Sequence, residues 1–228
     1  MSQQTTYTFQ PGSQSQLEGD NPVEIIVEQG NYKAIGNKVW TCGEVLSDFL
    51  FIKREKIKNS TVVELGSGLG LCGLLCSRLG AKKVYLTDSI ESSDILSSLR
   101  KNVELNNLND NICTMPIEWG IISEGLFNLD NIDVIIGSDT FYNREDFEPL
   151  IATVAFLLEK NPNANFITTY CERSPKRTIQ PLLDDWGLEA IMIEKPDLSL
   201  KKNGDSVIHD EPIFIYHIFK PETKLILN

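Results

Sequence analysis

The chain has 228 residues, of which 41% are hydrophobic and 23% are charged, and its formal net charge is −11 at pH 7. This composition is ordinary for a globular protein, and the negative charge argues against an obligate nucleic-acid binder, whose surface normally carries a basic patch. No apolar stretch reaches the roughly 18 residues of a membrane span, and residues 1–20 lack the basic and apolar regions of a secretory signal, so we expect a protein of the cytoplasm or nucleus.

The five cysteines agree with a reducing environment. They are odd in number and form no C-x-x-C pair, which favours neither a disulfide framework nor a zinc site. Cys72 and Cys76 are one helical turn apart, and we expect both to be small core residues rather than ligands.

From the N-terminus, residues 1–22 are rich in Gln, Ser, Thr and Gly and are expected to form a flexible segment. A short strand at 23–29 and an amphipathic helix at 43–54 follow. Apolar runs then predict strands at 61–65, 83–87, 112–117, 132–138 and 165–171. Between and after them, helices are predicted at 71–79, 91–106, 145–160 and 176–186.

The end of the chain breaks this alternation. Residues 188–194 and 211–220 are two strand patterns with no helix between them, joined by a polar loop at 195–210. Alternating strands and helices imply a parallel sheet with helices on both faces, whereas the last two strands imply an antiparallel hairpin at the sheet edge. The predicted fold is therefore a Rossmann-like, doubly wound α/β domain over residues 23–228, with a mostly parallel seven-stranded sheet and an antiparallel C-terminal hairpin.

One loop of this fold is rich in glycine. The stretch VVELGSGLGLCGLL, residues 62–75, leaves a strand and opens a helix with three glycines at alternate positions from Gly66. The dinucleotide fingerprint would need glycine in place of Leu71, a phosphate-binding P-loop would need a lysine, and a nucleophile elbow would need glycine in place of Leu65. The stretch therefore matches none of these three motifs. It has Glu64 followed by glycines at the alternate positions 66, 68 and 70.

The next strand ends in Asp88, about 20 residues after the glycine loop, where dinucleotide-binding folds place an acidic residue. Ligands of doubly wound sheets bind outside the carboxyl ends of the strands, and a carboxylate there can accept hydrogen bonds from the hydroxyls of a ribose. The alternative is that Asp88 caps the helix after it, and the two roles are compatible.

These motifs resemble a known family. The glycine loop followed by VYLTDS resembles motif I and the acidic second loop of class I S-adenosylmethionine-dependent methyltransferases. The stretches GNKVWTCGEVLSDFL, IEWG and SDTFY resemble the seven-β-strand protein methyltransferases of the lysine-methyltransferase type. Residues 145–174 look most similar to the methyltransferase-like twenty-three branch, which is credited with arginine methylation of histone. The resemblance extends from Gly36 to Lys220.

The resemblance implies S-adenosylmethionine as the cofactor and assigns contacts with it to eight residues. They are Trp40, Glu64, Gly66, Ser67, Gly68, Asp88, Trp119 and Ser138. Glycines let the backbone approach a ligand, and an indole ring can offer its face or edge to adenine. A structural alternative stays open for the tryptophans: Trp119 could pack against the sheet edge, and Trp40 could be a core residue, as we expect for Trp186.

The resemblance also implies two catalytic residues, Asp139 and Tyr142, opposite the glycine loop. A lysine amine has a reference pKa of about 10.4, so a site that methylates it must favour loss of a proton. Asp139 can accept hydrogen bonds from the substrate nitrogen and offset its developing charge, while Tyr142 can shape the channel; alternatively, Asp139 caps the following helix. An arginine guanidinium would need carboxylates to position it, and Asp139, Glu118 and Glu145 are the candidates.

The sequence therefore predicts an S-adenosylmethionine-dependent enzyme that methylates a lysine or arginine nitrogen of a protein, with histone as one candidate. The expected partner is a protein with a basic segment; we expect no membrane association, no direct nucleic-acid binding and no metal, and the oligomeric state stays open. Two rivals are a methyltransferase acting on a small molecule or nucleic acid, and a cofactor-binding interaction module without activity.

Overall fold

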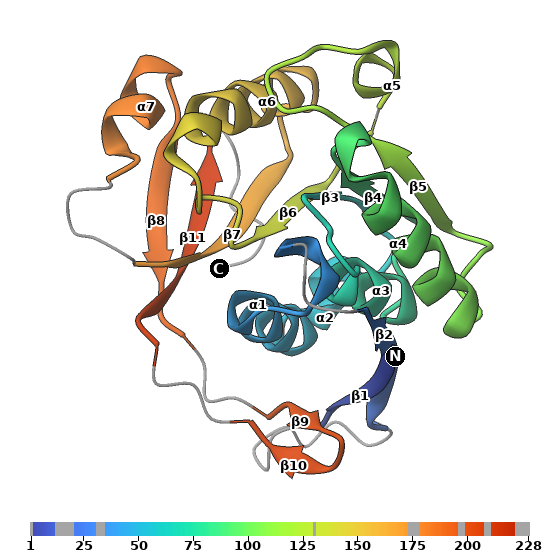
Figure 1. The fold of residues 1–228 in the computed structure, drawn as a ribbon. Coiled ribbons are helices and arrows are strands. Elements are labelled where there is room, and N and C mark those ends of the chain that lie inside the picture. The colour runs from blue at the N-terminus through green and yellow to red at the C-terminus, as the bar shows by residue number, and fades with distance from the viewer. Residues whose placement is uncertain are drawn as a thin grey trace.

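The structure, a computed structural model, describes residues 2–11, 21–30, 35–129, 131–172, 178–195, 199–207 and 211–221. A central sheet lies between two layers of helices, and a smaller sheet lies outside one of these layers (Figure 1). This is the α/β architecture predicted from the sequence.

The central sheet has seven strands in the order β5-β4-β3-β6-β7-β11-β8. In chain order they are β3 (Thr61–Leu65), β4 (Lys83–Asp88), β5 (Ile112–Pro116), β6 (Val134–Ser138), β7 (Asn165–Cys171), β8 (Glu189–Ile193) and β11 (Ile213–Phe219). Strands β3 to β7 run parallel to one another, whereas β11 is antiparallel to both β7 and β8. The predicted doubly wound sheet with its antiparallel C-terminal hairpin is confirmed. Because the strand order reverses between β3 and β6, the carboxyl ends of these strands form the switch point where ligands bind.

Helices cover both faces of this sheet. The α-helices are α1 (Thr41–Ile52), α2 (Arg54–Ile57), α3 (Leu71–Arg78), α4 (Ser93–Leu105), α5 (Glu124–Phe127), α6 (Phe147–Lys160) and α7 (Gln180–Asp185). Short 3-10 helices are η1 (Ile35–Asn37), η2 (Ile90–Ser92) and η3 (Arg144–Asp146). Helices α1, α3 and α4 share one apolar core with one face of the sheet, and α6 and α7 share another with the opposite face. Within the described residues, no helix is long and apolar enough to cross a bilayer.

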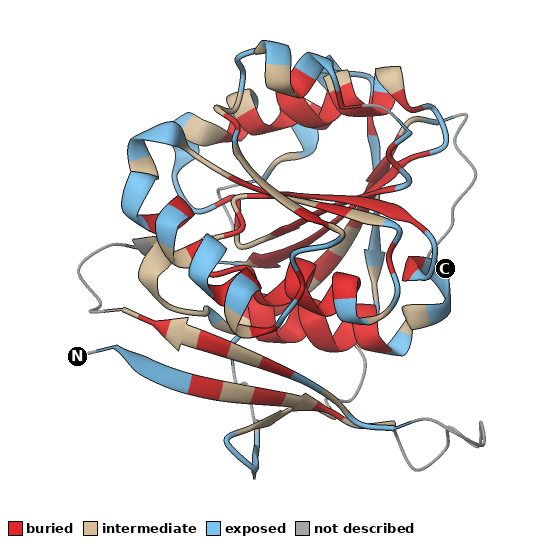
Figure 2. Ribbon diagram, turned by 90° about the vertical axis from the view of Figure 1, so that its right-hand side faces the viewer, coloured by how far each residue is buried: buried red, intermediate tan, exposed pale blue. Residues whose placement is uncertain are grey.

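The strands at the switch point are buried between the helical layers (Figure 2). All five residues of β3, TVVEL, are buried, as expected for a parallel strand covered on both faces. Helix α4 is amphipathic instead, because its buried Ile95, Leu99 and Val103 recur every four residues along one face. These local patterns explain why both elements could be predicted.

The segment predicted to be flexible, residues 1–22, instead contains a strand. Strand β1 (Gln3–Phe9) pairs with β2 (Val23–Gln29), and β9 (Lys201–Lys202) and β10 (Asp205–Ser206) complete a sheet of order β10-β9-β1-β2. Tyr7 and Phe9 are fully buried, and the Phe9 ring centroid lies 5.8 Å from that of Phe51 on α1. The prediction failed for β1 because the residues that bury this strand come from distant parts of the chain. Residues 12–20 of the predicted segment lie outside the described residues.

Three further expectations meet different outcomes. The polar loop predicted at 195–210 holds β9 and β10, which are too short to give a strand pattern. Trp186, predicted to be a core residue, follows the end of α7 and is 41% exposed. Cys72 and Cys76 are buried on α3, as predicted.

Candidate active site

The glycine loop between β3 and α3 is built from left-handed backbone. Gly66, Gly68 and Gly70 have φ angles of 67°, 53° and 87°, which L side chains rarely adopt. A Cβ atom at Gly66 would also lie only 3.0 Å from Cζ2 of Trp119. Glycine at this position therefore lets the indole ring of Trp119 lie against the loop backbone.

Asp88, the last residue of β4, faces this loop. Its carboxylate accepts hydrogen bonds from the backbone N–H groups of Gly68 and Ser89, both at 2.9 Å. The N-cap of η2 is Ser89, whose side chain accepts from the N–H of Glu91, so Asp88 is not the helix cap. Burial raises the pKa of the Asp88 carboxyl above its ordinary value and neighbouring Glu118 adds to the rise, whereas the two amide hydrogen bonds oppose it.

Glu64 is the acidic residue that opens the glycine motif. Only 1% of its surface is exposed, and its Oε2 accepts a hydrogen bond from the N–H of Gly73 at 3.0 Å. Burial raises the pKa of Glu64 to about 8, although hydrogen bonds from Gly73, Ser67 and Cys72 lower it. The side chain is therefore mostly a neutral acid at neutral pH in this structure.

The loop after β6 supplies Asp139. Its backbone has a φ of 54°, and its N–H donates to the carbonyl oxygen of Thr169 at 3.0 Å. The N-caps of the next two helices are Asn143 and Asp146, so the alternative role of Asp139 as a helix cap is wrong. A non-glycine residue held in left-handed backbone at a cavity wall is typical of functional positions.

Tyr142 follows on the same loop and is 38% exposed. Partial burial raises the pKa of its phenol above the ordinary value, and the carboxylates of Asp146, Asp88 and Asp139 add to the rise. The phenol therefore stays protonated at neutral pH and can donate a hydrogen bond.

Trp40, the N-cap residue of α1, lines the cavity. Its carbonyl oxygen accepts from the N–H groups of Gly43 at 2.9 Å and Glu44 at 3.2 Å, which fixes the first turn of the helix. The ammonium nitrogen of Lys38 lies 3.6 Å from the centroid of its ring, a cation–π contact. With 38% of its surface exposed, Trp40 is not a core residue.

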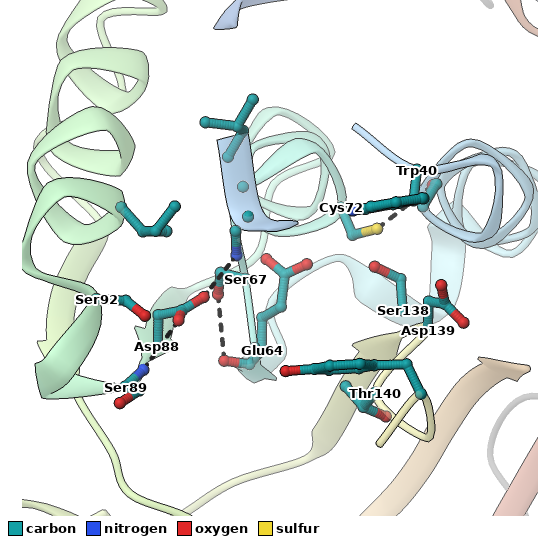
Figure 3. A pocket seen from close by; sticks show the side chains of 18 of the residues that line it. Trp40, Glu64, Ser67, Cys72, Asp88, Ser89, Ser92, Ser138, Asp139 and Thr140 are labelled. Atoms are coloured by element: carbon teal, nitrogen blue, oxygen red, sulfur yellow. Dashed lines mark hydrogen bonds between the residues drawn. The ribbon is translucent and has the colours of Figure 1, made fainter. Parts of the chain in front are cut away.

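These elements surround one cavity of about 780 Å³ at the carboxyl ends of the central strands, a volume typical of cofactor sites. The residues predicted from the sequence that line it are Trp40, Glu64, Gly66, Ser67, Gly68, Asp88, Trp119, Ser138, Asp139 and Tyr142. Figure 3 shows Asp88 and Asp139 on opposite sides of the cavity, with Glu64 between them. Every predicted site residue therefore lies at the same cavity.

Some lining residues were not predicted. Of the three carboxylates suggested for an arginine, Asp139 and Glu118 line the cavity, and Asp146 lines it in place of Glu145. The side-chain hydroxyl of Thr140 is buried at the cavity and has no hydrogen-bond partner among the described residues. The sequence did offer a signal for Thr140, because it lies between Asp139 and Tyr142 in a loop that follows a parallel strand.

The comparisons with known proteins decide the family. A family model described as lysine methyltransferase matches residues 19–180. The chain belongs to this family. Relatives include the histone-arginine methyltransferase METTL23 of Mus musculus, 36% identical over 182 residues that cover 80% of this chain and 69% of the relative. The protein-lysine N-methyltransferase EFM6 of Saccharomyces cerevisiae is 30% identical over 156 residues, which cover 58% of this chain and 62% of the relative.

Solved structures share the fold of this methyltransferase. A SAM-dependent methyltransferase of Aquifex aeolicus has a TM-score of 0.54 at 20% identity and covers 78% of this chain and 93% of its own. A putative RNA methyltransferase of Pyrococcus horikoshii has a TM-score of 0.56 at 18% identity, and the match covers 85% of this chain and 90% of the other. At such identities the likeness speaks for the fold alone.

S-adenosylmethionine is the cofactor of this methyltransferase, and the groups around the cavity fit it. The ligand combines a nucleoside with a zwitterionic amino acid, so it needs hydrogen-bond acceptors, donors and an aromatic contact. The carboxylate of Asp88, the buried carboxyl of Glu64, the backbone of the glycine loop, the indole of Trp119 and the unpartnered hydroxyl of Thr140 provide them.

Proposed function

We propose that the glycine loop and the loops after β4 and β5 bind S-adenosylmethionine, and that the loop after β6 acts on a lysine or arginine nitrogen of a protein. The observation that supports this most directly is the position of Asp139, across the cavity from Asp88 and in left-handed backbone. A cofactor held on one side would then present its reactive end to a carboxylate on the other.

On the cofactor side, each proposed role follows from the chemistry of the group. Asp88 accepts hydrogen bonds from the ribose hydroxyls, and Trp119 contacts adenine. Gly66 and Gly68 let the backbone approach the ligand, and the buried carboxyl of Glu64 faces its amino group. Trp40, Ser67 and Ser138 complete the set of cofactor contacts.

On the acceptor side, the chain must orient a nitrogen lone pair and accommodate its new charge. S-adenosylmethionine supplies an electrophilic methyl group on a sulfonium. Asp139 accepts a hydrogen bond from the acceptor nitrogen, which fixes the direction of the lone pair and offsets the developing positive charge. Tyr142 donates from its protonated phenol and narrows the channel to the methyl group.

The proposed substrate is a protein with a basic segment, encountered in the cytoplasm or nucleus. The relatives named as histone-arginine methyltransferases share more identity with this chain than the one named as a lysine methyltransferase, so arginine of histone is the first substrate to test. The carboxylates of Asp139, Glu118 and Asp146 around one cavity also suit a guanidinium, which is always charged.

Incubation of the protein with tritiated S-adenosylmethionine and cell extract tests this proposal. We expect label in proteins, and mass spectrometry of labelled peptides should identify methylated arginine or lysine. Label confined to RNA, DNA or metabolites would favour the rival methyltransferase. Cofactor binding without any labelled product would favour a silent interaction module.

A further inference from the structure

An apolar rim lies beside the cavity. It consists of Ile90, Ile121 and Ile122, which are 60%, 59% and 59% exposed, and we name these three residues the isoleucine rim. Ile90 directly follows Ser89, and the other two come shortly after Trp119; Ser89 and Trp119 both line the cavity. The exposed apolar side chains therefore belong to the loops that form the cavity wall.

The two parts of the isoleucine rim meet at Glu118. The carboxylate of Glu118 accepts hydrogen bonds from the N–H of Ile90 and, at 2.7 Å, from the hydroxyl of Ser89. Its backbone carbonyl accepts from the N–H of Ile121 at 3.2 Å. Glu118 itself lines the cavity, so its hydrogen bonds fix the backbone of Ile90 and Ile121 to one residue of the wall.

The backbone that carries Ile121 and Ile122 is held on two sides. The N–H of Ile117 donates to the carbonyl of Asp88 at 3.0 Å, and the N–H of Gly120 donates to Oγ1 of Thr153 on α6 at 2.8 Å. A fixed loop loses little conformational entropy when a partner binds, so side chains displayed on it make efficient contacts.

The cavity next to the isoleucine rim is acidic. Besides Glu64 and Asp88, the described residues that line it include the acidic Glu91, Glu118, Asp139 and Asp146, and Lys38 is the single basic residue among them. A nucleic acid would bring phosphates against these carboxylates, whereas a basic protein segment complements them. The surface thus combines an apolar edge with a negative interior.

We propose that the isoleucine rim binds the substrate polypeptide through an apolar side chain close in sequence to the lysine or arginine that enters the cavity. This inference rests on the proposed methyl transfer to a protein and adds a specificity determinant to it. Burying one isoleucine side chain in such a contact changes affinity by roughly tenfold or more.

Two oriented peptide libraries test the proposal, one with a fixed central arginine and one with a fixed central lysine, with all flanking positions randomised. Binding to the protein saturated with S-adenosylhomocysteine and methyl transfer from tritiated cofactor are both measured. We expect enrichment of aliphatic or aromatic residues at flanking positions. The variant Ile121→Ser/Ile122→Ser should lose this enrichment and bind the selected peptides at least roughly tenfold more weakly.

The matched control is Ile191→Ser/Met192→Ser, where the two side chains are 41% and 60% exposed but belong to β8, none of whose residues lines the cavity. It should keep the peptide preference. Ile90→Ser, across Glu118, is a second rim variant, and each variant is checked by its melting temperature and its affinity for S-adenosylhomocysteine.

The outcomes separate this inference from the proposed function. Absence of peptide binding, binding without apolar preference, or a preference that survives in both rim variants would overturn the role of the isoleucine rim. Peptides that bind with the expected preference but gain no label would instead refute methyl transfer to proteins. Labelled peptides without apolar preference would support methyl transfer to proteins but refute the role of the isoleucine rim in substrate binding.

Discussion

Asp88, at the end of β4, accepts hydrogen bonds from Gly68 of the glycine loop and from Ser89, the residue that follows it. In Asp88→Ala the ribose hydroxyls lose a charged acceptor, so we expect S-adenosylmethionine affinity to fall roughly tenfold to a hundredfold. Isothermal titration calorimetry measures this directly. Asp94→Ala, an exposed acidic residue at the start of α4, should leave the affinity unchanged. Equal S-adenosylmethionine affinities of the wild type and Asp88→Ala would show that Asp88 does not contribute to cofactor binding.

Glu64 makes stability depend on pH. Its carboxyl ionises near 4.5 in the unfolded chain, whereas burial raises its pKa to about 8 in the folded protein. Between these values the unfolded chain releases a proton that the folded protein keeps, so the free energy of unfolding falls by up to about 1.4 kcal/mol per pH unit. The contribution is fully present below pH 4.5 and is lost as pH rises through about 8.

The variant Glu64→Gln isolates this effect, because glutamine keeps an acceptor for the N–H of Gly73 but cannot ionise. Urea unfolding from about pH 5 to 8 should show Glu64→Gln gaining stability relative to the wild type as pH increases. Parallel stability curves for the two proteins would mean that Glu64 is already ionised in the folded state.

At the scale of elements, the buried side chain of Asn102 attaches α4 to β2 and to the glycine loop. Oδ1 of Asn102 accepts from the N–H of Glu28 at 2.8 Å, and its Nδ2 donates to the carbonyl of Leu69 in the glycine loop at 3.1 Å. Asn102→Ala leaves both backbone groups without this partner, so we expect unfolding in urea to require about 2–4 kcal/mol less free energy. Lys101→Ala, exposed on the same helix, is the control and should unfold as the wild type does. A loss below about 0.5 kcal/mol would contradict this role.

Elements could be predicted where burial follows from the local sequence. Strand β3 is an unbroken apolar run, and α4 repeats its apolar residues at helical spacing. Strand β1, QQTTYTF, is mostly polar and could not be predicted from its own sequence. It pairs in part with a distant segment, with Tyr7 opposite Lys202. The exposure of Trp186 likewise depends on where α7 ends, which composition does not indicate.

At the scale of the whole molecule, topology explains why the site could be predicted. Loops that follow parallel strands meet at one edge of the sheet, so Gly66, Asp88, Trp119 and Asp139 come together although they are far apart in the chain. Lys38 also lines the cavity but could not be predicted, because no local sequence pattern shows that the segment before α1 returns to this edge of the sheet.

The central claim is that one wall of the cavity holds the cofactor and the opposite wall acts on the acceptor nitrogen. The most direct test measures single-turnover methyl transfer and S-adenosylmethionine affinity on Asp139→Asn, using the protein most strongly labelled in cell extract. Because the variant removes the charge that offsets the methylated nitrogen, we predict a rate roughly a hundredfold lower with unchanged affinity, and a smaller loss for Tyr142→Phe. Transfer by Asp139→Asn at the wild-type rate would contradict the account.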